Sequence, residues 1–198
     1  MKMRIAAAML VWAAVWVLPM SAAARSEAFG EKIYDPGQLK PVDSYLKVKV
    51  GDLAPDFQLP SLNGGMVSPG QYRGKKNVVL SFVPAAWTPV CSDQWPGYNL
   101  AKEVFEENDA VLLGITVDNI PTLYAWTREM GKLWFPVLSD FWPHGRVAAS
   151  YGVLRTDGTS ERALFVIDKS GVIRAILVSD INVRPDLKWL VDKLKDLR

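Results

Sequence analysis

Cysteine and histidine each occur only once in this 198-residue sequence, as Cys91 and His144. A single cysteine excludes a disulfide within the chain, so the hydrophobic core must hold the fold together without a covalent cross-link. A single histidine with no second metal-ligating residue at usable spacing gives no basis for a metal site. We therefore expect no metal and no bound cofactor, and a structural role for His144.

The sequence also lacks a large excess of charge. Lys and Arg number 23 and Asp and Glu 21, a formal net charge of +2. Lys2 and Arg4 precede the apolar run 5–18, and small residues ending at Ala24 offer a cleavage position, which is the layout of a secretory signal peptide over residues 1–24. Cleavage leaves 21 basic and 21 acidic residues. Such a balance makes nucleic acid or an anionic membrane surface an unfavoured partner.

The N-terminal apolar run is too short to span a bilayer comfortably, because a transmembrane helix needs about 20 apolar residues. We therefore expect the segment to be removed and the product to be periplasmic or secreted, with no stable membrane anchor. An unpaired thiol in such an oxidising compartment indicates a reactive cysteine or one that pairs with another molecule.

The remainder divides into a lead-in, residues 25–50, and one domain, residues 51–198. In the lead-in, Tyr45–Val50 alternates like a short strand. In the first helix of the domain, Leu100 should face inward and Pro96 should kink or unwind one turn. The expected strands cover residues 56–60, 78–83, 111–117, 135–139, 163–168 and 172–178, and the expected helices cover 91–107, 121–130, 145–151 and 185–197. This order predicts an α/β protein with a central mixed β-sheet and helices on both faces, a thioredoxin-like fold with an N-terminal extension.

Cys91 lies where the strand over 78–83 is expected to give way to a helix. Unpaired backbone N–H groups and the positive end of a helix dipole favour the thiolate, which is the nucleophilic form of cysteine. The hydroxyl of Thr88 comes three residues earlier, one helical turn away. A lone cysteine is more often a small buried hydrophobe, but this placement favours a reactive sulfur.

The spacing of Pro84, Thr88 and Cys91 resembles the Pro-x-x-x-Thr-x-x-Cys signature of the peroxiredoxins, the alkyl hydroperoxide reductase and thiol-specific antioxidant family. Further segments resemble landmarks of that family in the same order, at residues 51–57, 72–75 and 162–168. The last of these resembles the strand that carries the family's active-site arginine, here Arg162. The resemblance covers essentially all of residues 51–198.

This resemblance implies a thiol-dependent peroxidase that reduces hydrogen peroxide or organic hydroperoxides. Cys91 would be the nucleophile that becomes a sulfenic acid, and Arg162 would supply a permanent positive charge to the thiolate and the peroxide. Thr88 would align the substrate, either by accepting from the peroxide or by donating to the sulfur. Pro84 would narrow the pocket, and backbone N–H groups of Val90 and Cys91 would bind the oxygen under attack.

A single cysteine implies the one-cysteine type of this family, in which an external thiol or a thioredoxin-like protein supplies the electrons. Many members of the family have a glutamate three residues after the cysteine, where this sequence has Gln94. Any role of that glutamate's negative charge therefore cannot be assigned to this sequence. Trp87 and Trp95 bracket the thiol, and they are candidates for the substrate pocket together with Val90. They are also candidates for a subunit contact, and the resemblance favours a homodimer.

Two alternatives keep the fold but change the function. An exported thioredoxin-like thiol–disulfide oxidoreductase requires Cys-x-x-Cys, yet Thr88 occupies the first cysteine position. Such proteins also have a proline just before the later strand, where this sequence has Arg162 and Ala163. A non-catalytic thioredoxin-like binding module would use Cys91 for packing alone, and direct reaction with peroxide distinguishes it from an enzyme.

Overall fold

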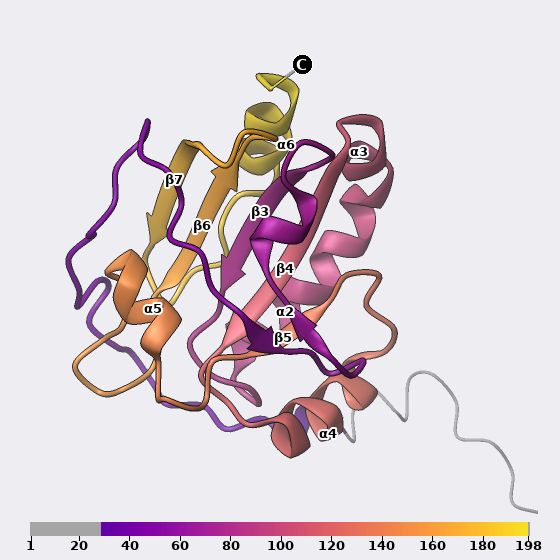
Figure 1. The fold of residues 1–198 in the computed structure, drawn as a ribbon. Coiled ribbons are helices and arrows are strands. Elements are labelled where there is room, and N and C mark those ends of the chain that lie inside the picture. The colour runs from indigo at the N-terminus through magenta and orange to yellow at the C-terminus, as the bar shows by residue number, and fades with distance from the viewer. Residues whose placement is uncertain (1–28, 198) are drawn as a thin grey trace, which may run out of the picture.

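The computed structural model describes residues 29–197, which form a five-stranded mixed sheet with helices on both faces (Figure 1). The strand order is β5-β4-β3-β6-β7, and a separate hairpin pairs β1 with β2. The strands are β1 Leu59–Pro60, β2 Met66–Val67, β3 Asn77–Phe82, β4 Ala110–Thr116, β5 Val137–Ser139, β6 Arg162–Ile167 and β7 Ile173–Ser179. The helices are α2 Pro89–Gly97, α3 Lys102–Glu107, α4 Ile120–Met130, α5 Arg146–Tyr151 and α6 Leu187–Lys195, with 3₁₀ turns η1 Pro69–Tyr72 and η2 Tyr98–Ala101. The expected architecture is confirmed.

Strand β3 is the centre of the sheet and leads directly to the candidate site. Every residue of β3 is buried, as its continuous apolar run predicted. It pairs in parallel with β4 and antiparallel with β6. Successive side chains point to opposite faces. Val79 therefore packs in the cluster that includes α2, α4 and α6, whereas Leu80 and Phe82 pack in the cluster that includes α5.

The single helix expected over 91–107 is two helices instead. Helix α2 ends at Gly97, one residue after Pro96, and η2 leads from it into α3. Proline lacks the amide hydrogen that a continuing helix needs, so the unwinding that the sequence predicted occurs here. The resulting change of phase turns one of the residues expected inward, Leu100, to the surface. Leu100 is 85% exposed, whereas Phe105 is fully buried.

The described part of the lead-in, residues 29–50, contains no strand, so the prediction for Tyr45–Val50 is wrong. Residues 45–50 meet the end of α5 through a hydrogen bond from Lys47 N to Tyr151 O at 3.2 Å and do not pair with a neighbouring strand. The strand expected over 56–60 is likewise reduced to the two residues of β1. Figure 1 shows the lead-in, in indigo, passing along the end of the sheet at which β3 finishes.

Gly114 in β4 leaves room for an aromatic cluster beneath the sheet. A Cβ atom at this position would lie 2.9 Å from the Trp95 ring and 3.0 Å from the Phe135 ring. Both rings are buried in the core, so they cannot move aside without disturbing their neighbours. Gly114→Ala is therefore expected to lower the free energy of unfolding by about 1–3 kcal/mol, the usual cost of overpacking a core.

Urea unfolding of the two proteins measures this cost. Gly30→Ala is the matched control, because no atom lies within 4 Å of a Cβ atom at Gly30. An unchanged midpoint for Gly114→Ala would contradict the packing described for β4.

The expected signal peptide, residues 1–24, lies outside the described residues. Within residues 29–197, no helix has both the length and the apolar character needed to cross a membrane.

Candidate active site

Cys91 lies at the beginning of α2, just beyond the end of the central strand. Its side chain is fully buried and forms no disulfide. Thr88 is the N-cap and Pro89 the first helical residue, so Cys91 occupies the third helical position. N–H groups in a first helical turn have no carbonyl partner within the helix. Those of Val90 and Cys91 therefore lie at the positive end of the helix dipole, where an anion is stabilised.

Arg162 meets Cys91 although 71 residues separate them in the sequence. Arg162 is the first residue of β6, the antiparallel neighbour of β3, so it lies at the edge of the sheet where β3 ends. Its Nη2 atom lies 3.5 Å from Cys91 Sγ. The structure thus brings together the two side chains that the sequence singled out, and their catalytic roles stay predictions.

The guanidinium of Arg162 is surrounded by neutral groups. The residue is 2% exposed. Its Nε and Nη2 atoms donate to Ile181 O at 3.0 and 2.9 Å, and Nη1 donates to Gln94 Oε1 at 2.6 Å. Among the described residues, Arg162 forms no ion pair with a carboxylate. A buried charge needs compensation, and Cys91 Sγ is the one side-chain sulfur within hydrogen-bond distance of this guanidinium among the described residues.

Gln94, where the sequence departs from the resembled family, continues this neutral network. Its Nε2 atom donates to the Tyr98 hydroxyl at 2.8 Å and to Ser81 Oγ at 3.3 Å. Burial raises the pKa of Tyr98, so the phenol stays uncharged at neutral pH. An amide here fixes the Arg162 side chain without cancelling its positive charge.

The Thr88 hydroxyl is oriented by the loop that precedes α2. Its Oγ1 donates to Ala85 O at 2.9 Å and does not cap the helix. Because its proton is committed to this carbonyl, the oxygen keeps its lone pairs for an incoming proton donor. Of the two roles expected for Thr88, accepting from a hydroperoxide fits this geometry and donating to the sulfur does not.

Asp118 holds the loop 84–88, a role that the sequence did not reveal. Its Oδ2 accepts from Ala86 N at 2.8 Å and from Thr116 Oγ1 at 2.5 Å. The position of Asp118 just beyond β4 was the available signal, because the carboxyl ends of parallel neighbours such as β3 and β4 meet at one edge.

In the loop 84–88, Trp87 has a φ of 62°, a left-handed conformation that costs a non-glycine residue about 1–2 kcal/mol.

A hollow of about 640 Å³ lies at this edge of the sheet. Pro84, Thr88, Val90 and Arg162 all line it, so these four predicted site residues share one cavity. On another side the wall comes from the lead-in, through Tyr34, Asp35, Pro36, Gly37, Gln38 and Leu39. The cavity therefore lies beside the helix start that carries the thiol, and a segment distant from it in the sequence completes the wall.

Trp87 and Trp95 are not among the residues that line this hollow, and their assignment to the substrate pocket stays a prediction. Trp95 is fully buried, with its ring centroid 5.1 Å from that of Trp126 and 6.1 Å from that of Phe135. Trp87 packs against Phe29 at 6.1 Å. An indole ring buries a large apolar area. The Trp95 ring is buried in the core, and the Trp87 ring packs against Phe29 of the lead-in.

His144 lies away from the lining of the hollow. Its Nε2 atom is 2.7 Å from Gly158 O, a contact that ties two loops together and agrees with the structural role expected. Across residues 29–197, no group of three or more His, Cys, Asp or Glu side chains could hold a metal ion.

Residues 50–176, which carry the sheet and the thiol, match the family described as AhpC/TSA. The sequence is 42% identical over 128 residues to alkyl hydroperoxide reductase E of Mycobacterium tuberculosis, covering 64% of this chain and 83% of that protein. It is 36% identical over 145 residues to peroxiredoxin-2 of Pongo abelii, covering 68% and 80%. The chain belongs to the AhpC/TSA family. It is a peroxiredoxin homologue and a thiol-dependent peroxidase.

The fold of this peroxiredoxin agrees with a solved structure, that of the reduced 2-Cys peroxiredoxin of Plasmodium vivax. The two superpose with a TM-score of 0.70 at 28% identity, covering 75% of this chain and 81% of that one. The thioredoxin-like fold expected from the sequence is thereby confirmed. The Plasmodium protein is named for two cysteines, whereas the present sequence contains one.

Ile181 was also missed by the sequence analysis, although its carbonyl accepts two hydrogen bonds from Arg162. A backbone carbonyl that accepts a hydrogen bond leaves no pattern in the side chains. The available signal was the β6–β7 hairpin, which pairs Arg162 with Ser179 and so places the residues just after β7 beside the arginine.

Proposed function

We propose that this peroxiredoxin is of the one-cysteine type and that Cys91 reduces hydroperoxides directly. The thiolate attacks the terminal oxygen of the peroxide, so an S–O bond forms while the O–O bond breaks. The hydroxyl group passes to sulfur, and the departing oxygen takes a proton from water to become water or an alcohol. Sulfur is oxidised to a sulfenic acid and the peroxide is reduced. The 3.5 Å contact of a buried, carboxylate-free Arg162 with Cys91 Sγ carries this proposal.

Further groups around Cys91 assist this step. Arg162 binds the peroxide and balances the charge that develops on the departing oxygen. Thr88 Oγ1 accepts a hydrogen bond from the O–H of the bound hydroperoxide, without taking its proton, and so sets the angle of the O–O bond to the sulfur. The N–H groups of Val90 and Cys91 add to the positive field at the helix start. Pro84, which lines the hollow, keeps water from the sulfenic acid.

An external thiol completes the cycle, because the sequence holds no second cysteine. One thiol attacks the sulfenic sulfur, forming a mixed disulfide and releasing water. A second thiol attacks that disulfide, forming an external disulfide and returning Cys91 as a thiol. The reductant is a small thiol or a thioredoxin-like protein.

Mass spectrometry tests this route after one equivalent of hydrogen peroxide and one of a small thiol. The expected product is a mixed disulfide at Cys91, followed by turnover with excess thiol. A covalent dimer through Cys91 as the obligatory intermediate would contradict it.

Thr88→Val is expected to slow peroxide reduction by about 10- to 100-fold, the loss of one hydrogen bond to a charged or charge-developing group. Valine preserves the shape of the side chain and removes the hydroxyl, so packing stays nearly constant. Thr88→Ser retains the hydroxyl and is the matched control, with a mild effect expected. Stopped-flow rates with hydrogen peroxide measure both variants, and equal rates for the valine variant and the wild type would remove Thr88 from the mechanism.

The proposed assembly is a homodimer. The loop beyond β5 exposes Phe141 (47%) and Trp142 (81%) side by side in the sequence. Neighbouring exposed aromatic side chains are a feature of protein interfaces. Light scattering at micromolar concentration is expected to give the mass of two chains, and the mass of one chain would contradict the dimer.

The proposed location is the periplasm or the extracellular medium. It rests on the basic start, the apolar run 5–18 and the small residues ending at Ala24. Mass spectrometry of native protein is expected to find Arg25 as the first residue, and an intact Met1 would contradict cleavage.

A further inference from the structure

The lead-in lies outside the family match, which begins at residue 50, yet it reaches the active-site hollow. Residues 34–39 supply one wall of this cavity. Tyr34 N donates to Trp87 O at 2.8 Å, which joins the lead-in to the loop that carries Thr88. The lead-in therefore contacts the catalytic loop directly.

Asn182, which also lines the cavity, binds the backbone of the lead-in. Leu39 N donates to Asn182 Oδ1 and Asn182 Nδ2 donates to Leu39 O, both at 2.9 Å. These two hydrogen bonds make the asparagine amide pair with the backbone of the lead-in as a second strand would. Asp180 Oδ1 accepts from Nδ2 of the same amide at 2.7 Å and fixes its orientation.

The peptide next to Asn182 connects the lead-in to the catalytic arginine. Ile181 N donates to Pro41 O at 3.0 Å. Ile181 O, on the same residue, accepts from Nε and Nη2 of Arg162. The lead-in, Ile181 and Arg162 therefore form one hydrogen-bonded chain that ends 3.5 Å from Cys91 Sγ.

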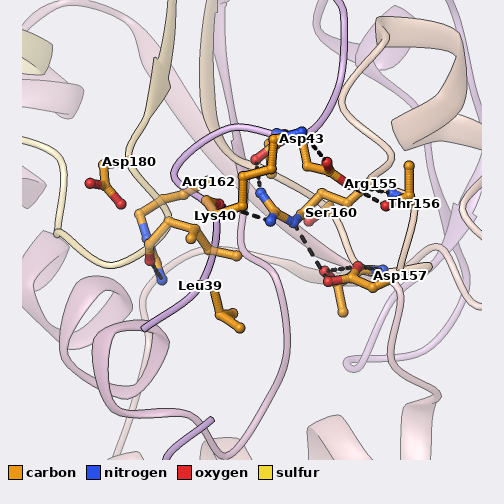
Figure 2. A network of polar contacts seen from close by, with 12 residues as sticks. Leu39, Lys40, Asp43, Arg155, Thr156, Asp157, Ser160, Arg162 and Asp180 are labelled. Atoms are coloured by element: carbon orange, nitrogen blue, oxygen red, sulfur yellow. Dashed lines mark hydrogen bonds and ion pairs between the residues drawn. The ribbon is translucent and has the colours of Figure 1, made fainter. Parts of the chain in front are cut away.

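A buried ion pair between Arg155 and Glu161 anchors the lead-in beyond this chain, and Figure 2 shows Arg155 beside Lys40 and Asp43 of the lead-in. Arg155 Nη1 lies 2.7 Å from Glu161 Oε2, and their side chains are 3% and 0% exposed. Arg155 Nη2 donates to Lys40 O at 2.9 Å, and Glu161 Oε1 accepts from Asp43 N at 2.6 Å. Both charges of the pair therefore bind lead-in backbone, so the lead-in is built into the domain at this point.

The Asp43 side chain adds a further anchor. Its Oδ2 accepts from Thr156 N at 3.0 Å and from the Thr156 hydroxyl. The hydrogen bond from the Lys40 ammonium and those from Thr156 hold the pKa of this carboxyl well below its usual range. The anchor is thus charged throughout the neutral range.

We infer that the segment 34–43 is part of the active site and that Asn182 is a positioning residue for Arg162. The lead-in holds the Ile181 peptide, and this peptide holds the guanidinium against the sulfur. A misplacement of about 1 Å can cost up to 100-fold in rate when a group must meet a reacting atom. The inference rests on the proposed role of Arg162 in peroxide reduction.

Asn182→Ala tests the inference more cleanly than a change to the buried ion pair, because breaking such a pair is expected to unfold the protein. Two rates are measured for each variant at one pH: reaction of Cys91 with hydrogen peroxide and its alkylation by iodoacetamide. Alkylation reports the reactivity of the sulfur without a peroxide for Arg162 to bind. Asn182→Ala should slow the peroxide reaction about tenfold and slow alkylation by a clearly smaller factor, because alkylation loses only the effect of Arg162 on the sulfur and not its effect on a bound peroxide.

Asn99→Ala is the matched control, since the Asn99 amide donates to Lys132 O in an exposed contact that is not part of the cavity lining. Neither rate should change. The decisive comparison repeats Asn182→Ala in an Arg162→Lys background. A residue that acts through Arg162 should cause no further loss of the peroxide rate once the guanidinium is gone.

Three results would overturn the inference alone: a normal peroxide rate for Asn182→Ala, equal slowing of both reactions, or undiminished slowing in the Arg162→Lys background. A normal peroxide rate for Arg162→Lys by itself would overturn the proposed role of the arginine and the inference with it. The two failures are therefore distinguishable.

Discussion

Cys91→Ser is expected to reduce peroxide consumption to the rate of the external thiol alone. A hydroxyl ionises far less readily than a thiol, so the variant lacks an anionic nucleophile. The side chain is buried, and Arg162 can donate to a serine oxygen as it does to Sγ, so the fold should persist. Peroxide consumption with excess small thiol measures activity, and a thermal melt followed by circular dichroism measures folding.

The double variant Cys91→Ser, Ser92→Cys is a control that keeps one cysteine and moves it by one position. Ser92 Oγ accepts from Trp126 Nε1 at 2.9 Å, so a thiol here would face the tryptophan and not Arg162. It should stay inactive. Activity in either protein above that of the external thiol alone would show that a generic thiol, or none, is sufficient.

Arg162→Lys is expected to slow peroxide reduction by about 100-fold or more, as when one donor to a developing oxyanion is removed. Lysine retains a positive charge but replaces a planar fork of donors by a single ammonium. It cannot bind Ile181 O, Gln94 Oε1 and the sulfur region in the same geometry. Stopped-flow rates with hydrogen peroxide measure the loss.

Arg184→Lys is the matched control for this substitution. Arg184 also contacts α2, through an exposed ion pair with Asp93 at 2.8 Å, and such surface pairs contribute little. Its peroxide rate should match that of the wild type. If the lysine variants at 162 and 184 were equally active, the buried guanidinium would have no special part in the reaction.

The sequence predicted the sheet and the central residues of the site because local patterns encode them. The apolar, β-branched run 78–83 is typical of a strand buried on both faces, and β3 is such a strand. The spacing of Pro84, Thr88 and Cys91 fixes the turn and the helix start together. Arg162 required the family resemblance, because spacing alone does not distinguish a buried arginine from a solvated one.

Long-range packing accounts for what the sequence did not predict. The alternation of Tyr45–Val50 fits a strand, but within residues 29–197 the segment pairs with no strand and is tied to the end of α5 through Tyr151 O. Trp95 lies one helical turn beyond the thiol. Its ring packs against Gly114 of β4, where a side chain would leave no room for it, and this long-range contact is not visible in the sequence. The chain from Pro41 through Ile181 to Arg162 consists largely of backbone groups, which no residue pattern records.

The central claim is that the Cys91 thiolate reacts directly with a hydroperoxide. Reduced protein is mixed with one equivalent of hydrogen peroxide in the presence of dimedone, which traps sulfenic acids, and the digest is analysed by mass spectrometry while peroxide loss is followed in time. The account predicts a dimedone adduct on the peptide that contains Cys91 and peroxide loss much faster than with free cysteine. No adduct, together with peroxide loss no faster than with free cysteine, would contradict it.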